Sequence, residues 1–210
     1  MIGIIDTESQ NIGSIENCLK FLKIKYKIVQ NIDQANKCDK IILPGVGSFD
    51  YVSNSLLKKK FTLNSLKSVI LKKKVLAICV GMQILFSKSE EGKKLGLNIF
   101  HGKIKRLSSI KCKDQIPHVG YNSIKLSNKE KVLSEIFEKD FYFTHSYVVE
   151  KNFSNIPFKG TYGLTKYGNV EFVSFIKYGN ILATQFHPEK SGQAGLNLLK
   201  YFYEEKKNNI

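Results

Sequence analysis

The sequence contains a single arginine, Arg106, among its 33 basic residues, although its formal net charge is +15. A strongly basic chain ordinarily suggests nucleic-acid binding. Phosphates and guanine edges, however, are best recognised by the planar fork of arginine. The basic excess is almost entirely lysine, and we interpret the lysine runs at 58–60 and 72–74 as solvated helix ends rather than as an anion-binding patch. We therefore expect no nucleic-acid partner.

Cysteine is also scarce, and its four copies lie far apart, at positions 18, 38, 79 and 112. This spacing offers no CxxC pair, no metal-ligand cluster and no dense disulfide framework. Long apolar runs are missing as well, since no stretch reaches the roughly 18 residues of a membrane span. The chain opens on Met-Ile-Gly-Ile-Ile-Asp, without the basic region of a secretory signal. These absences predict a soluble, cytoplasmic protein with no metal site and no membrane contact.

What the sequence does contain, in its first half, is an alternation of strand-length apolar runs with helical patterns. Strands are predicted at 2–5, 26–29, 41–43 and 75–78, and helices at 12–23, within 49–71 and from residue 81 onward. Such alternation is typical of an α/β unit built on a parallel sheet. No linker, repeat or composition break divides the chain, so we expect one domain over residues 1–210.

The second half is richer in strand-like runs. These lie at 99–107, 123–126, 141–149, 160–165, 170–177 and 181–186, and an amphipathic helix is predicted at 193–204. Gly168-Asn169 and Gly179-Asn180 separate the last three runs. Gly-Asn pairs between apolar runs predict tight hairpins, so the end of the sheet is expected to be a meander.

Cys79 lies between the apolar run 75–78 and the predicted helix, with Gly81 two residues later. A sharp turn from strand to helix that carries a nucleophile needs small neighbours, and here Ala77 and Gly81 supply them. Such a turn places the side chain at the start of a helix, where free N–H groups favour a thiolate. Taken alone, the segment is equally compatible with a buried structural cysteine.

His187 and Glu189 follow the last predicted strand and are held two residues apart by Pro188. A thiol nucleophile needs a general base, and an imidazole base needs a carboxylate that fixes its tautomer and stabilises its charged form. Cys79, His187 and Glu189 together have the chemistry of a catalytic triad. A lone loop histidine would be interpreted as structural, and it is the joint occurrence with Cys79 that favours catalysis.

A glycine-rich loop, Pro44-Gly45-Val46-Gly47-Ser48, follows the predicted strand 41–43. Glycine at 45 and 47 lets the backbone approach a ligand or turn over a peptide, as an oxyanion-binding loop requires. The loop lacks the Gly-Lys-Ser/Thr ending of a nucleotide P-loop. By itself it is also compatible with another phosphate loop or a plain turn.

These motifs resemble the class I (triad) glutamine amidotransferases along essentially the whole chain. The resemblance rests on Cys79-Val-Gly-Met-Gln, Pro44-Gly-Val-Gly-Ser-Phe and Phe186-His-Pro-Glu-Lys-Ser. Two further segments, Pro117-His-Val-Gly-Tyr-Asn and Phe143-Thr-His-Ser-Tyr, are similar to one branch, the glutaminase subunits of imidazole glycerol phosphate synthase. The resemblance implies a flavodoxin-like α/β glutaminase fold, with a central mostly parallel sheet, helices on both faces and a β-rich C-terminal half.

The resemblance also implies an activity and a set of site residues. The enzyme would hydrolyse L-glutamine to glutamate and ammonia through a cysteinyl thioester, without a cofactor, and pass the ammonia to a (β/α)8-barrel cyclase in a heterodimer that serves histidine biosynthesis. By carry-over, Cys79 is the nucleophile, His187 the acid and base, and Glu189 its orienting carboxylate. Glutamine would be bound by Gly45, Gly47, Val80, Gln83, Ser146 and Tyr147. The partner would be contacted by Asn11, Tyr121, Tyr142 and Lys190.

Two positions depart from the family pattern on the expected partner face. Gln10-Asn11 stands where the family usually has Gly-Asn, and Gly120-Tyr121-Asn122 where it usually has Gly-Trp-Asn. A paralogous amidotransferase whose partner amidinates a surface-polysaccharide or glycan sugar therefore stays open as an alternative. So does a stand-alone cysteine hydrolase, whereas a non-catalytic binding protein is disfavoured because all three triad residues are present. His101, His118 and His145 are expected to shape the structure rather than to transfer protons.

Overall fold

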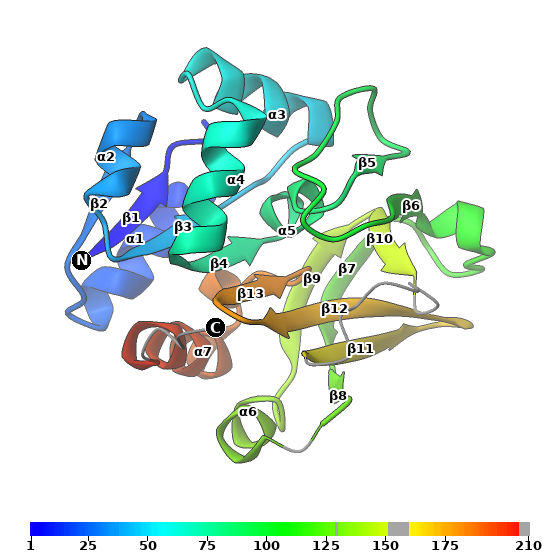
Figure 1. Cartoon of the computed structure of the whole chain (residues 1–210). Helices are drawn as coiled ribbons and strands as arrows, with labels where there is room; N and C mark the ends of the chain where they lie inside the picture. Colours follow the sequence, from blue (N-terminus) through cyan, green and yellow to red (C-terminus); the bar gives the residue numbers. More distant parts are fainter. Residues whose placement is uncertain (129, 151–159, 206–210) are drawn as a thin grey trace.

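The computed structural model describes residues 1–128, 130–150 and 160–205. One mixed sheet runs through the molecule (Figure 1), and its strands follow the order β2-β1-β3-β4-β13-β12-β10-β6-β5. The first five of these pair in parallel, and the remainder are mostly antiparallel. The predicted class, an α/β fold with a mostly parallel sheet and a β-rich second half, is confirmed.

The parallel half has the strand order of flavodoxin-like folds. Its strands are β1 (Ile2–Ile5), β2 (Tyr26–Val29), β3 (Lys40–Leu43), β4 (Lys74–Ile78) and β13 (Ile181–Thr184). Apart from β2 and the first residue of β3, they are fully buried. Burial on both faces explains why these strands are continuous Ile, Val and Leu runs rather than alternating ones.

Helices cover both faces of this parallel sheet (Figure 1). On one face lie α1 (Ile12–Phe21) and α7 (Gly192–Glu204), and on the other α2 (Ile32–Asn36), α3 (Phe49–Lys58) and α4 (Leu63–Lys72). The single helical stretch predicted within 49–71 is thus two helices. The second helix begins after Thr62, whose side chain accepts a hydrogen bond from the N–H of Ser65 and so caps the N-terminus of α4.

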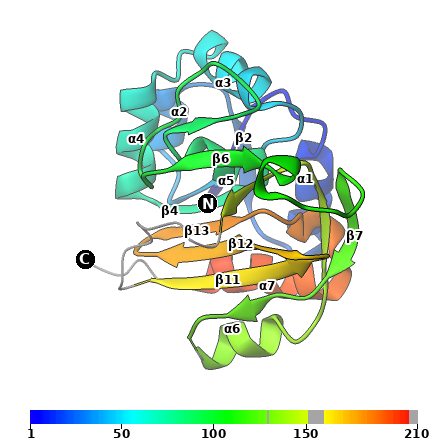
Figure 2. The ribbon, with the colours of Figure 1, turned by 90° about the vertical axis from the view of Figure 1, so that its right-hand side faces the viewer.

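The second half contains the predicted meander, and Figure 2 shows its strands side by side. Strands β11 (Thr161–Tyr167), β12 (Val170–Tyr178) and β13 pair in sequence through Gly168-Asn169 and Gly179-Asn180, as expected. The remaining strands are β5 (Lys88–Ser89), β6 (Lys103–Arg106), β7 (His118–Asn122), β8 (Lys125–Leu126), β9 (Phe141–His145) and β10 (Tyr147–Glu150), and α6 spans Lys131–Ile136.

The run 141–149 is not one strand, as its composition predicted, but two. The chain breaks at Ser146, whose carbonyl accepts a hydrogen bond from the N–H of Leu107. Strand β9 pairs with β7 in a separate small sheet, whereas β10 joins β12 and β6 in the main one. Local sequence cannot encode this change of sheet, because both halves of the run are equally apolar.

No helix among the described residues is long and apolar enough to cross a membrane.

A cluster of buried charged side chains lies at the C-terminal end of α7. There Glu205 forms ion pairs with Lys74 and with Lys177, the latter at 3.0 Å, and the three side chains are at most 16 % exposed. Burial would raise the pKa of Glu205, but the hydrogen bonds from Lys74 and Lys177 outweigh it and lower that pKa.

We expect Glu205→Gln to lower the free energy of unfolding by about 3 kcal/mol, because it removes a negative partner from two buried ammonium groups, of which Lys177 keeps its ion pair with Glu130. A carboxylate whose pKa is lower in the folded state stabilises above its unfolded pKa, and this contribution disappears as the pH falls through the folded value. Denaturant unfolding at pH about 7 and about 3 should therefore show a difference from wild type that shrinks in acid. Glu204→Gln, which alters an exposed pair with Lys200, is the matched control and should change little. An equal loss at both pH values would contradict this interpretation.

Candidate active site

Cys79 occupies a strained turn between β4 and α5 (Val80–Ile84). Its φ is 53° and its ψ −111°, a region that residues other than glycine seldom adopt. Glycine is needed beside it, because a Cβ on Gly81 would collide with the carbonyl oxygen of Leu43. The turn therefore has the geometry of a nucleophile elbow. It holds a buried cysteine, 5 % exposed, at the carboxyl end of a central strand.

His187 and Glu189 lie at the carboxyl end of the neighbouring strand β13, around the short 3-10 turn Pro188–Lys190. The Nδ1 of His187 is 2.7 Å from Oε1 of Glu189, with both side chains essentially inaccessible. Burial would lower the pKa of His187, but the Cys79 sulfur and the Glu189 carboxylate outweigh burial and raise that pKa to about 10. At neutral pH this favours an imidazolium, whose Nε2 is buried and has no hydrogen-bond partner among the described residues.

Asn11 is placed differently from the sequence expectation. It was expected on the partner face, yet it is only 3 % exposed and its Nδ2 donates to Oε1 of Glu189 over 2.8 Å. The same carboxylate oxygen thus receives both His187 and Asn11. Because a bound carboxylate cannot rotate freely, Asn11 fixes the group that orients the imidazole.

A hollow of about 230 Å³ opens beside Cys79. It brings together most of the residues expected to bind substrate, and it adds several that sequence reasoning missed. Its lining consists of Val46, Gly47, Cys79, Val80, Gln83, Glu91, Thr144, His145, Ser146, Tyr147 and His187. The expected residue absent from this lining is Gly45, which lies just behind it, where a Cβ would meet the backbone N of Gly81 at 2.7 Å.

Glu91 is the one acidic side chain in that lining, and it belongs to no motif that the sequence analysis identified. Its Oε2 accepts the N–H of Phe49, at the start of α3, over 2.7 Å. Burial raises the pKa of Glu91, partly opposed by this N–H. The carboxylate therefore faces the hollow while it holds the helix that follows the glycine loop.

In the conformation of the glycine loop two N–H donors near Cys79 are occupied, one at the start of α5 and one in the loop itself. The N–H of Val80 points at the carbonyl oxygen of Gly45, 3.3 Å away. The N–H of Val46 donates instead to Oγ of Ser9, over 3.1 Å. Gly47 has a φ of +112°, which a side chain would oppose. Ser9, a second residue that the sequence did not single out, thus anchors the loop.

Two buried histidines lie on the wall next to the hollow. His118 Nδ1 and His145 Nε2 are 3.1 Å apart, and His145 Nδ1 faces the carbonyl oxygen of Tyr147. Burial lowers the pKa of His118 to about 4, and burial together with the neighbouring His118 lowers that of His145 to about 3. Both rings are therefore neutral at physiological pH, which agrees with the expected shaping role.

The other three residues expected at the partner face form one cluster. Tyr121 is 60 % exposed and its hydroxyl donates to the carbonyl oxygen of Lys190. The rings of Tyr121 and Tyr142 meet edge to face at 5.5 Å, and the Lys190 ammonium lies 5.8 Å from the Tyr142 ring. The N–H of His187 donates to the carbonyl oxygen of Tyr142, which ties this cluster directly to the candidate base.

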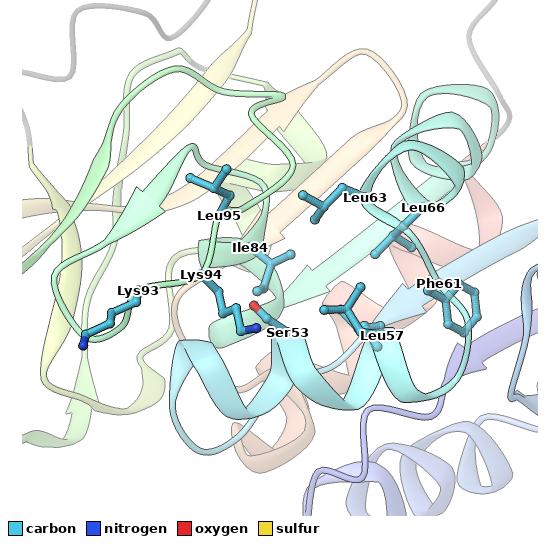
Figure 3. A pocket seen from close by; sticks show the side chains of 10 residues that line it. Ser53, Leu57, Phe61, Leu63, Leu66, Ile84, Lys93, Lys94 and Leu95 are labelled. Carbon is cyan, nitrogen blue, oxygen red and sulfur yellow. The ribbon is translucent and has the colours of Figure 1, made fainter.

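A second hollow, of about 310 Å³, lies between α3, α4 and residues 93–95. Figure 3 shows leucine, isoleucine and phenylalanine side chains around it. The hydroxyl in its lining, Oγ of Ser53, is already bonded to the carbonyl oxygen of Phe49. The lining of this hollow includes no cysteine, histidine or carboxylate, so the chemistry belongs to the smaller one. Among the described residues no cluster of side chains is arranged to hold a metal ion.

Comparison with known proteins agrees with this geometry. The family model for class I glutamine amidotransferases matches residues 3–205. A protein of Leptospira borgpetersenii described as imidazole glycerol phosphate synthase subunit HisH is 39 % identical, over 96 % of this chain and 98 % of its own length. The HisH subunit of Methanocaldococcus jannaschii is 40 % identical, over 97 % and 99 %. The fused hisHF protein of Schizosaccharomyces pombe is 37 % identical over 96 % of this chain, which spans 38 % of that protein.

Solved structures match at the level of the fold. A glutamine amidotransferase superposes with a TM-score of 0.67 at 15 % identity, over 97 % of both chains. A putative GMP synthase component from Thermoplasma acidophilum superposes with a TM-score of 0.66 at 21 % identity, over 96 % of this chain and 90 % of its own. The near-complete family match, the full-length relatives and the Cys79 turn agree, and the chain belongs to the class I glutamine amidotransferases.

Proposed function

We propose that this protein is the glutaminase subunit of an imidazole glycerol phosphate synthase, with Cys79, His187 and Glu189 as its catalytic triad. The observation that carries the proposal is the hollow into which the strained Cys79 and the Glu189-bound His187 both open. The names of the HisH relatives support the pathway, and the fused protein of S. pombe supports a synthase partner that works in contact with the glutaminase.

The triad accounts for the first half of the reaction. The Cys79 thiolate attacks the side-chain amide carbon of glutamine, a C–S bond forms, and the carbonyl electron pair moves to oxygen. His187 gives its Nε2 proton to the amide nitrogen, the C–N bond breaks, and ammonia leaves. Glu189 keeps Nδ1 of His187 as a donor, so that Nε2 is the nitrogen that exchanges the proton.

The second half returns the enzyme to its starting state. Water attacks the glutamyl thioester and His187 Nε2 takes its proton. The C–S bond then breaks with its electron pair on sulfur, so glutamate is released and the thiolate and imidazolium are restored. Burial of His187 at 0 % exposure limits the water that reaches the base to what the hollow admits.

Glutamine is held in this proposal by its amino-acid end. Glu91 supplies the negative charge that an α-ammonium group needs, and Oε1 of Gln83 is buried and free to accept a further hydrogen bond. Ser146 and Tyr147 also line the hollow. A carboxylate in a confined hollow discriminates strongly, because a substrate without the ammonium would leave it unpaired.

We expect Glu91→Gln to raise the KM for glutamine at least about tenfold, with a smaller effect on kcat, because it removes one charged hydrogen bond from substrate binding. The glutamine side chain keeps an oxygen for the Phe49 N–H, so the loop anchor remains. Steady-state kinetics of glutamate release measures both constants. Glu90→Gln, at the adjacent residue outside the hollow, is the control. An unchanged KM in Glu91→Gln would exclude the ammonium-binding role.

The protein is proposed to work in a heterodimer with a (β/α)8-barrel cyclase. The cluster of Tyr121, Tyr142 and Lys190 is the contact surface in this proposal, since it is exposed and its backbone bonds directly to His187. Asn11 acts one layer deeper, through Glu189. The partner would use the ammonia to form imidazole glycerol phosphate.

Two further expectations belong to the proposal. Residues 1–210 form a single amidotransferase domain, which the family match over 3–205 supports. The protein works in the cytoplasm, where thiols stay reduced, in keeping with the unpaired state of Cys18, Cys38, Cys79 and Cys112.

A second candidate keeps the same glutaminase chemistry but supplies ammonia for amidination of a surface-polysaccharide or glycan sugar. It is favoured by Gln10 and Tyr121, which depart from the family pattern at the partner side. Co-purification with each barrel protein encoded beside the gene, followed by glutaminase assays with and without that partner's substrate, separates the two. Activation by the histidine-pathway nucleotide supports the first function, activation by a nucleotide sugar supports the second, and full activity of the free chain would favour a stand-alone hydrolase.

A further inference from the structure

Gln185 lies beside Cys79 although it belongs to a different strand and a different part of the chain. Strands β13 and β4 are parallel with Thr184 paired to Ile78, so the next residues along both strands are Gln185 and Cys79. The backbone is pinned there, since the N–H of Cys79 donates to the carbonyl oxygen of Thr184 over 2.7 Å and the N–H of Gln185 to that of Ser174 over 2.8 Å. Gln185 is completely buried.

The side-chain amide of Gln185 bridges two groups. Its Nε2 lies 3.6 Å from Sγ of Cys79, and its Oε1 accepts Nε2 of Gln83 over 3.0 Å. The orientation of both amides follows from one fixed acceptor. Gln83 Nε2 also donates to the carbonyl oxygen of Tyr147, which can only accept, so Gln83 must present nitrogen on this side. Gln185 must then present oxygen to Gln83 and its N–H to the sulfur.

We propose that Gln185 donates a hydrogen bond to the reacting sulfur of Cys79 and stabilises it as a thiolate, both when it attacks and when it leaves. The inference rests on the proposed thioester chemistry. Cys79 is 5 % exposed, so water supplies little of the hydrogen bonding that a thiolate needs. A hydrogen bond from a neutral amide to an anion is stronger than one between neutral groups.

The step in which this donor matters most is breakdown of the thioester. Water adds to the acyl carbon as His187 takes its proton, the C–S bond breaks, and the electron pair stays on sulfur. His187 has taken the proton of the water at this point, and the N–H of Gln185 is a further donor held beside the sulfur. A neutral amide suits this role, because it adds no charge to compete with His187.

The network also connects the sulfur to the wall of the substrate hollow. The chain runs from Cys79 through Gln185 and Gln83 to the carbonyl oxygen of Tyr147. Gln83 therefore has two functions, since its nitrogen fixes Gln185 while its buried Oε1 stays available to the substrate. The side-chain amide of Gln83 thus takes part both in glutamine binding and, through Gln185, in stabilising the sulfur.

The test is the pH dependence of Cys79 alkylation in the full-length chain, which requires neither glutamine nor a partner. Iodoacetamide labelling is followed by mass spectrometry of the Cys79 peptide, because three other thiols are present. Gln185→Met keeps the length of the side chain and removes both the donor to Cys79 and the oxygen that accepts Gln83 Nε2. We expect the midpoint of the pH–rate profile to move up by about one pH unit. In the assembled enzyme kcat for glutamine should fall about tenfold.

Two variants complete the design. Gln185→Glu keeps an oxygen that accepts Gln83 Nε2 but puts a carboxylate beside the Cys79 sulfur. The midpoint of its pH–rate profile should therefore rise further than that of Gln185→Met. Gln193→Met, on the exposed side of α7, is the matched control with an unchanged profile. Wild-type profiles in both Gln185 variants would overturn the inference. If Gln185→Met does not fold, the Gln185→Glu profile decides alone. Failure of the proposed function is separate, since it appears as glutaminase activity without the Cys79 thiol.

Discussion

Cys79→Ala is expected to abolish glutamine hydrolysis, lowering kcat by about four orders of magnitude or more. The thiolate is the only group in the proposed mechanism that forms a covalent bond to the substrate. Synthesis by the assembled enzyme from added ammonium salt should persist at the wild-type rate, because external ammonia bypasses the glutaminase. The measurement is the pair of rates, with glutamine and with ammonium, in the same preparation.

The matched control is Cys112→Ala, which removes a half-buried thiol outside the hollow and should leave both rates unchanged. The alanine at position 79 must adopt the same strained backbone, with φ of 53°. Thermal unfolding of both variants checks that the fold is retained. Substantial hydrolysis in Cys79→Ala would refute the triad and would leave the buried cysteine as a structural residue of the core.

The free chain is expected to be a poor glutaminase, about a hundred to a thousand times slower than the complex with its barrel partner and nucleotide, because an oxyanion donor is missing. The N–H of Val80 is occupied by the carbonyl oxygen of Gly45, and that of Val46 is turned away to Ser9. Turning over the peptide between Gly45 and Val46 would release the first donor and aim the second at the substrate. The glycine at 45 makes both orientations accessible.

Ser9→Ala tests this gate directly, since it removes the hydroxyl that holds the Val46 N–H. Loss of one neutral hydrogen bond, of about 1 kcal/mol, should raise hydrolysis by the free chain by up to about fivefold and leave the fully activated complex nearly unchanged. Ser53→Ala is the control, because its buried hydroxyl bonds to Phe49 rather than to the loop. Steady-state glutamate release is measured for the free chain, the complex and the complex with nucleotide. Equal rates in all three states of the wild-type protein would contradict the gate.

Much of the framework was determined by the sequence itself, because its signals are local. The buried β-branched runs predicted the parallel strands, and the two Gly-Asn pairs predicted the β11–β12–β13 meander. The step from strand to Cys79 to Gly81 predicted the sharp turn that the structure shows. His187 and Glu189 could be paired because only Pro188 separates them. In each case the deciding residues lie within one element or one turn.

Only the tertiary structure decided which distant groups meet at the site. Asn11 reaches Glu189 across 178 positions, Gln83 reaches Gln185 across 102, and Val46 reaches Ser9 across 37. Glu91 enters the hollow from a loop without a motif. The break at Ser146, which sends β9 and β10 to different sheets, depends on the strands available on either side. Buried polar groups must find hydrogen-bond partners, and this rule selects contacts of this kind. It can act only after the parallel strands have brought their carboxyl ends together.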